Sequence, residues 1–488
     1  NTLGISGSKT NFVGSMLISN DAGTGTLDAA SNNTGFGHEA FDDLTTGDSN
    51  TAVGHLALTK NTTGASNTAV GKSALTSNTT ADNNTAVGNL ALLCNTTGAE
   101  NTAVGIQALC KTTTGCRNTA VGASALVCNT EGCENVAMGR NAMRCNTTGD
   151  SNLGIGAYSL GANTTANNNT SIGHRALQSN TTGASNTAVG CGALAANTTA
   201  NNNVAVGMCA MLATTTGANN TAVGFSALDT NTTGCENVAV GRDTMFTSTT
   251  SCRSVGVGYR ALKATTTGSF NVGVGYHSLT TNTTGHSNAA LGNNSLEANT
   301  EGFGNVALGC ATLASNTTGD ANVAVGRSAL LSNTTADNNT AVGYCAGAAI
   351  TTGYQNTALG QNALDSTTTA NQNTAIGAQT LAANTSGYAN TAVGFNALCT
   401  HTTGNSNTAV GDHAMKLTTT GTFNVAIGDN ALCANTTASS NVAIGRDAMF
   451  VNTTGTANVA VGALALDANT TANNNTAVGN LSATGNTT

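Results

Sequence analysis

Residues 50–66 read NTAVGHLALTKNTTGAS, and nearly the same seventeen residues follow at once as NTAVGKSALTSNTTADN and then as NTAVGNLALLCNTTGAE. Aligned from Asn33, this period holds without insertion to Thr488 and gives 27 units, of which the last is truncated. We number the positions of the unit 1 to 17, with Asn33 and Asn50 at position 1. A fixed period of this kind predicts a repeat architecture in which each unit is one geometric step stacked on its neighbours.

The unit contains fixed and variable positions. Position 5 is Gly in all 27 units, and position 1 is Asn in every unit but one, where Ser254 stands. Position 4 is always Val, Ile, Leu, Met or Phe, and position 9 is Leu, Met or Phe except at Gly347 and Ala483. Because the fixed positions are apolar or conformational, we expect positions 4 and 9, such as Val53 and Leu58, to face inward. The variable positions 6, 7, 10, 11, 16 and 17 are expected to face solvent.

The local sequence favours strands over helices. Gly inside a helix costs on the order of 1 kcal/mol relative to Ala, which makes Ala-Val-Gly a poor helix centre, whereas clusters of Asn and Thr favour turns and strands. We predict a short strand at positions 2–4, a second one carrying positions 8 and 9, and an exposed turn at positions 12–15. The fold class is therefore an all-β parallel β-solenoid, or β-roll. It covers residues 33–488, and residues 1–32 form an irregular N-terminal cap or first coil.

The core of such a coil is thin, since each unit supplies one or two large apolar residues and two alanines. We expect partner chains, or a tight interior that only Ala and Gly fit, to complete it. Charged residues make up 8% of the chain, against roughly 25% in typical domains. The net charge of −8 over 488 residues gives no electrostatic footprint for nucleic acid or an anionic membrane.

No apolar run approaches the roughly 20 residues of a membrane helix, so no membrane insertion is expected. The chain opens NTLGISGSKT without an initiator Met or a signal peptide and closes partway through a unit. Both ends therefore look like cuts in something longer.

Fourteen cysteines stand in a chain that contains no C-x-x-C motif, which disfavours a zinc ribbon or a thioredoxin-like site. Residues stacked on consecutive coils lie about 5 Å apart, within the Cα range of about 4.4–6.8 Å that a disulfide needs. Disulfide rungs would imply an oxidising, extracellular setting; the alternative is free thiols. The candidate pairs share position 16 or 11 in consecutive units: Cys116 with Cys133, Cys235 with Cys252, and Cys128 with Cys145. Two further pairs are one position out of phase: Cys94 with Cys110, and Cys191 with Cys209.

Position 12 offers sixteen N-x-[ST] sequons, which predict a row of N-glycans if the turn is exposed. The same slot also accepts Leu44, Thr112, Ile350 and His401, so the sequon is alternatively a by-product of an Asn-Thr turn. The candidate acceptors are Asn61, Asn78, Asn95, Asn146, Asn163, Asn180, Asn197, Asn231, Asn282, Asn316, Asn333, Asn384, Asn435, Asn452, Asn469 and Asn486.

No catalytic, cofactor-binding or metal-binding residues are expected, and the chain is not predicted to be an enzyme. The Gly-Lys-Ser at Gly71–Ser73 lacks the Gly that a P-loop requires five residues earlier, where Ser66 stands. The seven His residues scatter over different positions, and Asp and Glu occupy variable ones singly. Threonines at positions 13 and 14 would stack into rows of the kind that ice-binding solenoids use, although adjacent strand residues point to opposite sides.

The pattern NTAVGxxAL…G, and NVAIG at Asn424–Gly428, resemble the head repeats of trimeric autotransporter adhesins and the similar β-roll repeats of phage and virus tail-fibre proteins. The resemblance covers about residues 11–488, with NFVG at Asn11–Gly14 as a first, irregular coil. The coil here is longer than the typical adhesin head repeat and closer to the tail-fibre variants. The resemblance implies a left-handed roll, three chains side by side, and a surface fibre that touches host cells.

The sequence therefore favours a structural, adhesive fibre segment, extracellular, on a cell surface or on a virion. It would present a multivalent polar surface, and self-association as a homotrimer or a head-to-tail filament is expected, with cell-surface glycans as possible ligands. Weak contacts at many equivalent positions add up through avidity. Three alternatives remain: a spacer without ligand, a glycosylated filament scaffold, and a solenoid that binds ice or polysaccharide.

Overall fold

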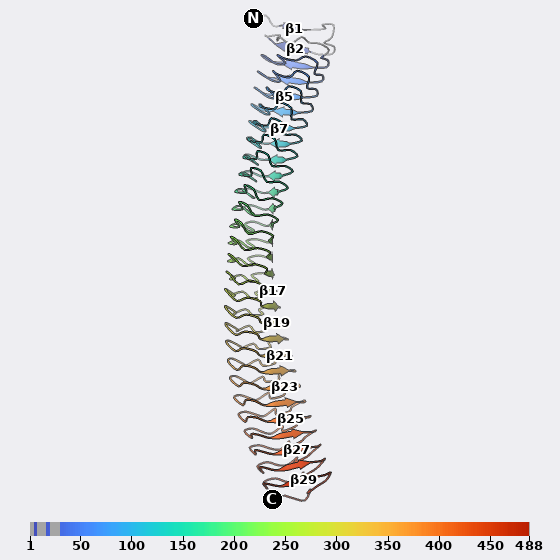
Figure 1. The fold of residues 1–488 in the computed structure, drawn as a ribbon, viewed down its shortest axis with the longest axis vertical. Helices are drawn as coiled ribbons and strands as arrows, with labels where there is room; N and C mark the ends of the chain where they lie inside the picture. Colours follow the sequence, from blue (N-terminus) through green and yellow to red (C-terminus); the bar gives the residue numbers. More distant parts are fainter. Residues whose placement is uncertain (1–3, 7–15, 20–29, 488) are drawn as a thin grey trace. The chain divides into compact units, whose positions relative to one another are not determined.

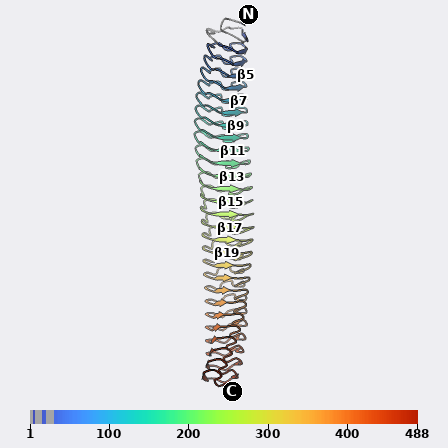
Figure 2. The same ribbon diagram turned by 90° about the vertical axis from the view of Figure 1, so that its right-hand side faces the viewer.

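The computed structural model describes residues 4–6, 16–19 and 30–487. Within these residues the fold is all-β, and the chain divides into two compact units, Asn1–Asp243 and Thr244–Thr488. In each unit short strands lie one above the next, and each seventeen-residue repeat forms one coil (Figures 1 and 2). The predicted parallel β-solenoid is confirmed.

Every repeat contributes one strand of three residues at positions 2–4. The strands of the first unit are β1 (Gly4–Ser6), β2 (Met16–Ser19), β3 (Thr34–Phe36), β4 (Thr51–Val53), β5 (Thr68–Val70), β6 (Thr85–Val87), β7 (Thr102–Val104), β8 (Thr119–Val121), β9 (Val136–Met138), β10 (Leu153–Ile155), β11 (Thr170–Ile172), β12 (Thr187–Val189), β13 (Val204–Val206), β14 (Thr221–Val223) and β15 (Val238–Val240). Those of the second unit are β16 (Val255–Val257), β17 (Val272–Val274), β18 (Ala289–Leu291), β19 (Val306–Leu308), β20 (Val323–Val325), β21 (Thr340–Val342), β22 (Thr357–Leu359), β23 (Thr374–Ile376), β24 (Thr391–Val393), β25 (Thr408–Val410), β26 (Val425–Ile427), β27 (Val442–Ile444), β28 (Val459–Val461) and β29 (Thr476–Val478).

The register of the strands follows the repeat. Thr51 pairs with Thr68, seventeen residues later, and the other repeat strands of each unit pair in parallel in the same way. Strand β2 joins the stack with an offset of eighteen, since Met16 pairs with Thr34, and β1 runs antiparallel to β2. The predicted first coil at Asn11–Gly14 lies outside the described residues; the strand that pairs with β3 is β2.

The inward residue of each strand is the small one, so the prediction for position 4 is wrong. Ala52 is fully buried, whereas Val53 is 36% exposed. Side chains alternate along a strand, so in a three-residue strand positions 2 and 4 share the outer face and only position 3 points into the coil. Leu58 at position 9 is fully buried, as predicted, and packs with Ala57 at position 8, which is also fully buried. The core of a coil is thus two alanines and one leucine.

The predicted second strand is absent in the described repeats, where positions 6–11 form turns. Leu56 and Leu58 have φ angles of 58° and 51°, in the left-handed region that costs a non-glycine residue roughly 1–2 kcal/mol. Full burial of a Leu side chain contributes about 1.5–3 kcal/mol, which offsets this cost at position 9. The Leu58 amide donates to the carbonyl of Ala74 in the next coil at 3.1 Å, so the turn is still bonded along the stack.

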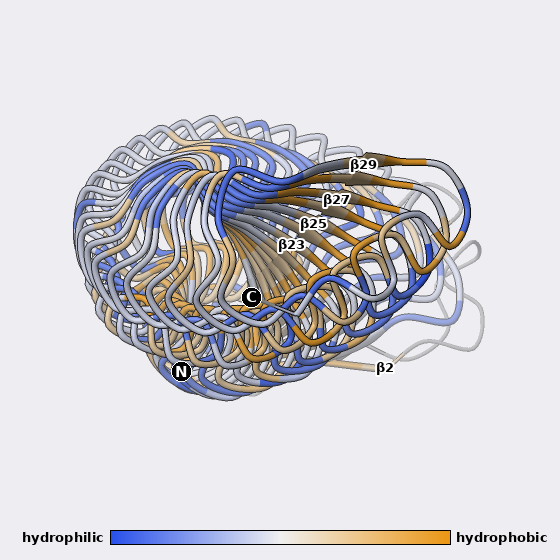
Figure 3. Ribbon diagram, turned by 90° about the horizontal axis from the view of Figure 1, so that it is seen from below, coloured by the Kyte–Doolittle hydropathy of each residue, from blue (hydrophilic) through white to orange (hydrophobic). Residues whose placement is uncertain are grey.

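Asparagine at position 1 lies inside the coil and bonds it to both neighbours. The Oδ1 of Asn50 accepts the backbone N–H of Asn67 at 2.9 Å, and the Nδ2 of Asn67 donates to the carbonyl of Ala81 at 2.8 Å. Both asparagines are fully buried. In Figure 3 hydrophilic residues come immediately before β23, β25, β27 and β29, and hydrophobic residues follow at the strand ends. The fixed Asn is therefore a structural rung.

Positions 12 and 13 form two further rows along the stack. The Nδ2 of Asn61 donates to the carbonyl of Gly64, and the Nδ2 of Asn78 donates to Oδ1 of Asn61, each at 2.8 Å. The Oγ1 of Thr62 donates to the carbonyl of Thr79 at 3.0 Å. Position 13 is Thr in all 27 units, and this bond to the next coil explains that constancy.

Two constraints require glycine at position 5: its backbone φ angle and the close approach of the next coil. Gly105 has a φ of +135°, a conformation that L side chains rarely adopt, and a Cβ added there would lie 2.6 Å from the carbonyl oxygen of Gly122 in the next coil. The strained backbone angle alone costs a non-glycine residue about 1–3 kcal/mol. Only glycine allows consecutive coils to approach this closely at the strand end.

Two departures from the repeat compensate each other in a single coil. Position 9 is Gly347 and position 12 is Ile350, where most other coils carry Leu and Asn. A Cβ added at Gly347 would lie 2.9 Å from Cδ1 of Ile350 and 3.1 Å from Cδ2 of Leu330. Ile350 therefore occupies part of the space that a leucine at position 9 would fill, which keeps this coil packed in the absence of that leucine.

The glycine constraint predicts the effect of adding one methyl group. We expect Gly105→Ala to destabilise its coil by about 1–3 kcal/mol, measured as faster amide hydrogen exchange in residues 88–139. Gly485→Ala is the matched control, because a Cβ there meets nothing within 4 Å; its effect should stay within about 0.5 kcal/mol. Equal effects of the two substitutions would contradict the close-approach explanation.

Candidate functional site

The outer side of the strands is the most extensive candidate surface. We call the side chains at positions 2 and 4 the strand face. At position 4 the exposed fraction is 37% for Val104, 42% for Met138 and 48% for Leu291. No charged residue occupies either position from residue 33 onward. Each unit thus exposes a continuous, uncharged row of Val, Ile, Leu and Thr along its whole stack of strands.

A row of threonines stands on a different part of each coil. Position 14 is Thr in 24 of 27 units and is exposed in every described coil; the exceptions are Glu131, Glu301 and Ser386. Within the described range, the side chains at position 14 donate no hydrogen bond to another residue of the chain, in contrast to the threonines at position 13. Of the two threonine rows at positions 13 and 14, the one at position 14 is therefore available to solvent or a ligand.

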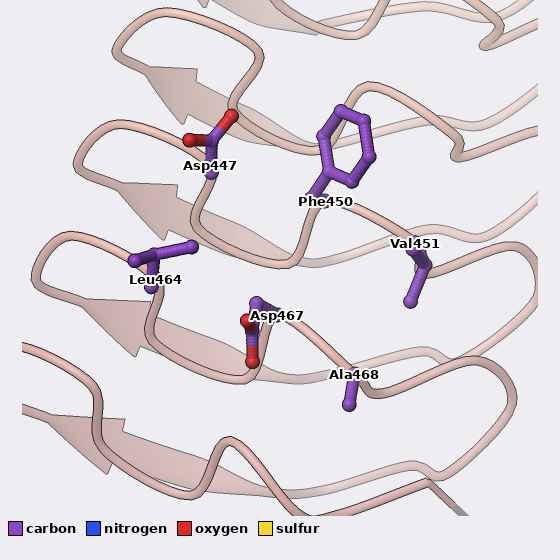
Figure 4. Close-up of a pocket in the computed structure, with 6 residues that line it drawn as sticks. All are labelled: Asp447, Phe450, Val451, Leu464, Asp467 and Ala468. Atoms are coloured by element: carbon purple, nitrogen blue, oxygen red, sulfur yellow. The ribbon is translucent and has the colours of Figure 1, made fainter.

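A hollow of about 560 Å³ lies between two consecutive coils of the second unit (Figure 4). Its six lining residues are stacked pairs from positions 7, 10 and 11: Asp447 above Leu464, Phe450 above Asp467, and Val451 above Ala468. Asp447 is within 3.6 Å of Arg446 and accepts a bond from Asn430 at 3.2 Å. The buried Oδ1 of Asp467 has no hydrogen-bond partner.

The same groove recurs in the first unit with a different lining. A hollow of about 240 Å³ there is again lined from positions 7, 10 and 11, by Asn141, Arg144, Cys145, Tyr158, Gly161, Ala162 and Gln178. Asp365, also at position 10, is half-buried, and burial raises the pKa of its carboxyl above its usual range. The groove is a consequence of the repeat geometry, and its chemistry changes from coil to coil.

The three predicted cysteine pairs differ in the structure. The Sγ atoms of Cys116 and Cys133 are 2.8 Å apart. Cys128 and Cys145 stack at position 11, but in the described part of the chain no hydrogen bond joins their thiols. Cys235 belongs to the first unit and Cys252 to the second, so that pairing stays a prediction. Of the out-of-phase pairs, the backbone N–H of Cys94 donates to the carbonyl of Cys110, and that of Cys209 to Cys191.

The N-glycosylation prediction is corrected by the burial of position 12. Fifteen of the sixteen candidate asparagines, from Asn61 to Asn469, are fully buried, and Asn486 in the last coil is partly exposed. The Nδ2 atom that would carry the glycan instead donates inside the coil, as at Asn61 to Gly64. The turn at position 12 is not exposed, so a glycan on these side chains is incompatible with the coil. The fixed Asn at position 1 and the frequent Asn at position 12 were the signal for this role, but the sequence alone predicted an exposed turn at position 12.

Among the described residues, no group of three or more His, Cys, Asp or Glu side chains is arranged to hold a metal ion. No described segment is a helix long and apolar enough to cross a membrane. No protein-family model matches the sequence, and comparison with curated proteins gives no match.

One buried titratable group interrupts the position 12 row. His401 is fully buried, and its Nε2 donates to the carbonyl of Gly404 at 2.7 Å. Burial lowers the pKa of His401 below its usual value of 6.5, and hydrogen bonds to the backbone of Gly404 and Thr418 oppose part of this shift. The side chains stacked on either side, Asn384 and Thr418 at the same position, are uncharged. The imidazole is therefore held neutral in the folded coil.

This burial predicts a local pH dependence. Below about pH 6.5 the imidazole of His401 binds a proton in the unfolded coil but not in the folded coil. Its contribution to the free energy of unfolding is therefore fully present above that pH, and it is lost as the pH falls toward the lowered pKa of the folded coil. We expect amide protection factors in residues 384–424 to fall between pH 7.5 and pH 5. His401→Asn should remove the decline, because Asn is the usual residue at position 12. The exposed His286→Asn should leave it unchanged; an unchanged decline in His401→Asn would contradict the assignment.

Proposed function

We propose that this chain is a structural and adhesive segment of an extracellular or virion fibre. The observation that carries the proposal is the strand face, an uncharged apolar surface that runs the length of each unit. Monomeric soluble proteins rarely expose contiguous apolar patches beyond a few hundred Å². The thirteen strands β3–β15 of the first unit, at about 4.8 Å per coil and with a face roughly 10 Å wide, give on the order of 600 Å².

The occupant of the strand face is a further copy of this chain. Each unit exposes the same kind of face, on the order of 600 Å², which approaches the roughly 800 Å² per partner of a standard stable interface. The face repeats once per coil, and another stack with the same spacing interdigitates with it over its full length, as packed sheets do. Lateral packing through this face favours side-by-side assembly over head-to-tail stacking.

The resemblance to trimeric adhesin heads and tail-fibre β-rolls supports three chains in this assembly and a fibre that contacts a host surface. The positions away from the strand face supply the contact surface. Positions 6 and 16 include exposed apolar and aromatic side chains, such as Ile106, Tyr276, Phe303 and Tyr388. Repetition at the coil spacing lets weak contacts to cell-surface glycans add through avidity, by up to about 10²–10⁴.

Charges on the strand face test the proposal. Val87 and Val104 point outward on consecutive coils, so Val87→Arg with Val104→Arg should leave each coil folded but place unpaired charges in the interface. We expect wild-type protein to sediment as a multiple of the 47.9 kDa chain and the variant to associate at least about 10-fold more weakly. Thr97→Arg with Thr114→Arg, at exposed position 14 of the same coils, is the control. A wild-type chain that stays monomeric at about 100 μM would overturn the proposal.

The exposed threonine row favours a second candidate, the binding of a periodic surface such as ice or crystalline polysaccharide. A single row of hydroxyl and methyl groups at the coil spacing is the feature such a ligand would match. If this candidate holds, the purified chain shows thermal hysteresis or binds insoluble polysaccharide, and a variant with Thr→Lys at position 14 in four consecutive coils loses the effect. If the chain shows neither activity but still associates, the threonine-row candidate is rejected and the fibre proposal stands.

A further inference from the structure

We propose that Cys116 and Cys133 are the site of a reversible disulfide that joins two consecutive coils of the first unit. Both residues occupy position 16, one full repeat apart. Their sulfur atoms are 2.8 Å apart, and the backbone N–H of Cys116 also points to Sγ of Cys133 at 3.1 Å. The site lies outside the strand face and does not depend on the proposed function.

Neighbouring contacts hold the two cysteines in register. The backbone N–H of Glu134 donates to the carbonyl of Cys116 at 3.0 Å. The guanidinium of Arg117 bridges Glu100 on one side and Glu134 on the other, each at 3.2 Å. The stacking distance of about 5 Å between equivalent residues lies within the Cα range of about 4.4–6.8 Å of a disulfide. The bond therefore forms by a small movement of two side chains, without a backbone shift.

The thiols are arranged for exchange with an external disulfide. The two thiols share a hydrogen bond in which either sulfur can be the donor, and this hydrogen bond, with burial second, raises the pKa of Cys116 to about 11. Cys116 therefore stays protonated near neutral pH, and the first attack falls to Cys133, whose thiol lies 3.5 Å from the carbonyl of Glu131. Both residues are half-buried, so a small disulfide reaches them from solvent.

The reaction balances as two exchanges. The thiolate of Cys133 attacks a small-molecule disulfide, forms a mixed disulfide and releases one thiolate. Cys116 then loses its proton to solvent and attacks the mixed disulfide at the sulfur of Cys133. This attack displaces the second thiolate and forms the Cys116–Cys133 bond. The two protein thiols are oxidised, the external disulfide is reduced to two thiols, and excess thiol reverses both steps.

A bond at this position closes a loop of one repeat and joins two consecutive coils of the stack. Separation of the coils that begin at Asn101 and Asn118 would require the bond to break, so local opening between them is suppressed when it is formed. We expect amide exchange in residues 101–134 to slow by about 10- to 100-fold on oxidation, the range that closure of a loop of this length supports.

The chain contains its own matched control. Cys128 and Cys145 are also seventeen residues apart and stacked on consecutive coils, but their thiols form no hydrogen bond to each other in the described structure. An unfolded chain would join either pair equally, so a preference for Cys116–Cys133 reports the folded geometry alone.

Full-length protein is incubated with oxidised glutathione, alkylated, and digested with trypsin and a protease specific for Glu. Cleavage after Lys111, Arg117, Glu131 and Glu134 isolates residues 112–117 and 132–134, and a link between these two peptides is unique to the proposed bond. We expect it to form at least 10-fold faster than any link to Cys145, to disappear with dithiothreitol, and to lose its preference in denaturant. In Cys133→Ser, Cys116 should remain a thiol or carry glutathione. Equal rates for the two pairs in the folded chain, or glutathione adducts without a link, would overturn the proposal.

Discussion

A buried row of asparagine amides, bonded to the coils above and below, is the interaction on which the rest of the structure depends. The side-chain Nδ2 of Asn67 donates to the carbonyl of Ala81, and the backbone N–H of Asn67 donates to Oδ1 of Asn50 in the preceding coil. A buried amide without a partner costs about 1–3 kcal/mol. Because each side chain needs a partner in the next coil at the same position, an inserted or deleted residue would orphan a polar group. This explains a period that never slips over 27 units.

The narrowness of the coil follows from the same stacking. The glycines at position 5 bring consecutive backbones closer than any Cβ permits, as at Gly105 and Gly122. The interior then has room for two alanines, one leucine and the amide rows. The larger apolar side chains at position 4 are left on the outer side of the strand, where Val53 is partly exposed. An uncharged face on the strands is thus a consequence of a small core, and it is the basis of the proposed association between copies.

Departures from the repeat are informative because the frame around them is constant. Ile350 at position 12 occupies space that Gly347 leaves at position 9, so the two exceptions compensate each other in packing. His401 replaces an amide in a buried row and introduces the one titratable group held at position 12. Cys116 and Cys133 place thiols at position 16, which carries side chains of many other kinds in every coil except those of Cys235 and Cys252. Each exception changes one local property and leaves the register intact.

The sequence by itself determined the period, the parallel β-solenoid and the coil as the unit of structure, because an uninterrupted repeat admits one stacking step. It also determined that Leu58 is inside and that glycine at position 5 is conformational. Only the tertiary structure decided that Val53 points outward, that no second strand follows, and that Asn61 is buried. The physical reason is that these features depend on closure of the coil. With one three-residue strand and left-handed backbone angles at Leu56 and Leu58, the direction of each side chain is set by the path of the whole turn, which no local pattern of Asn, Thr and Val encodes.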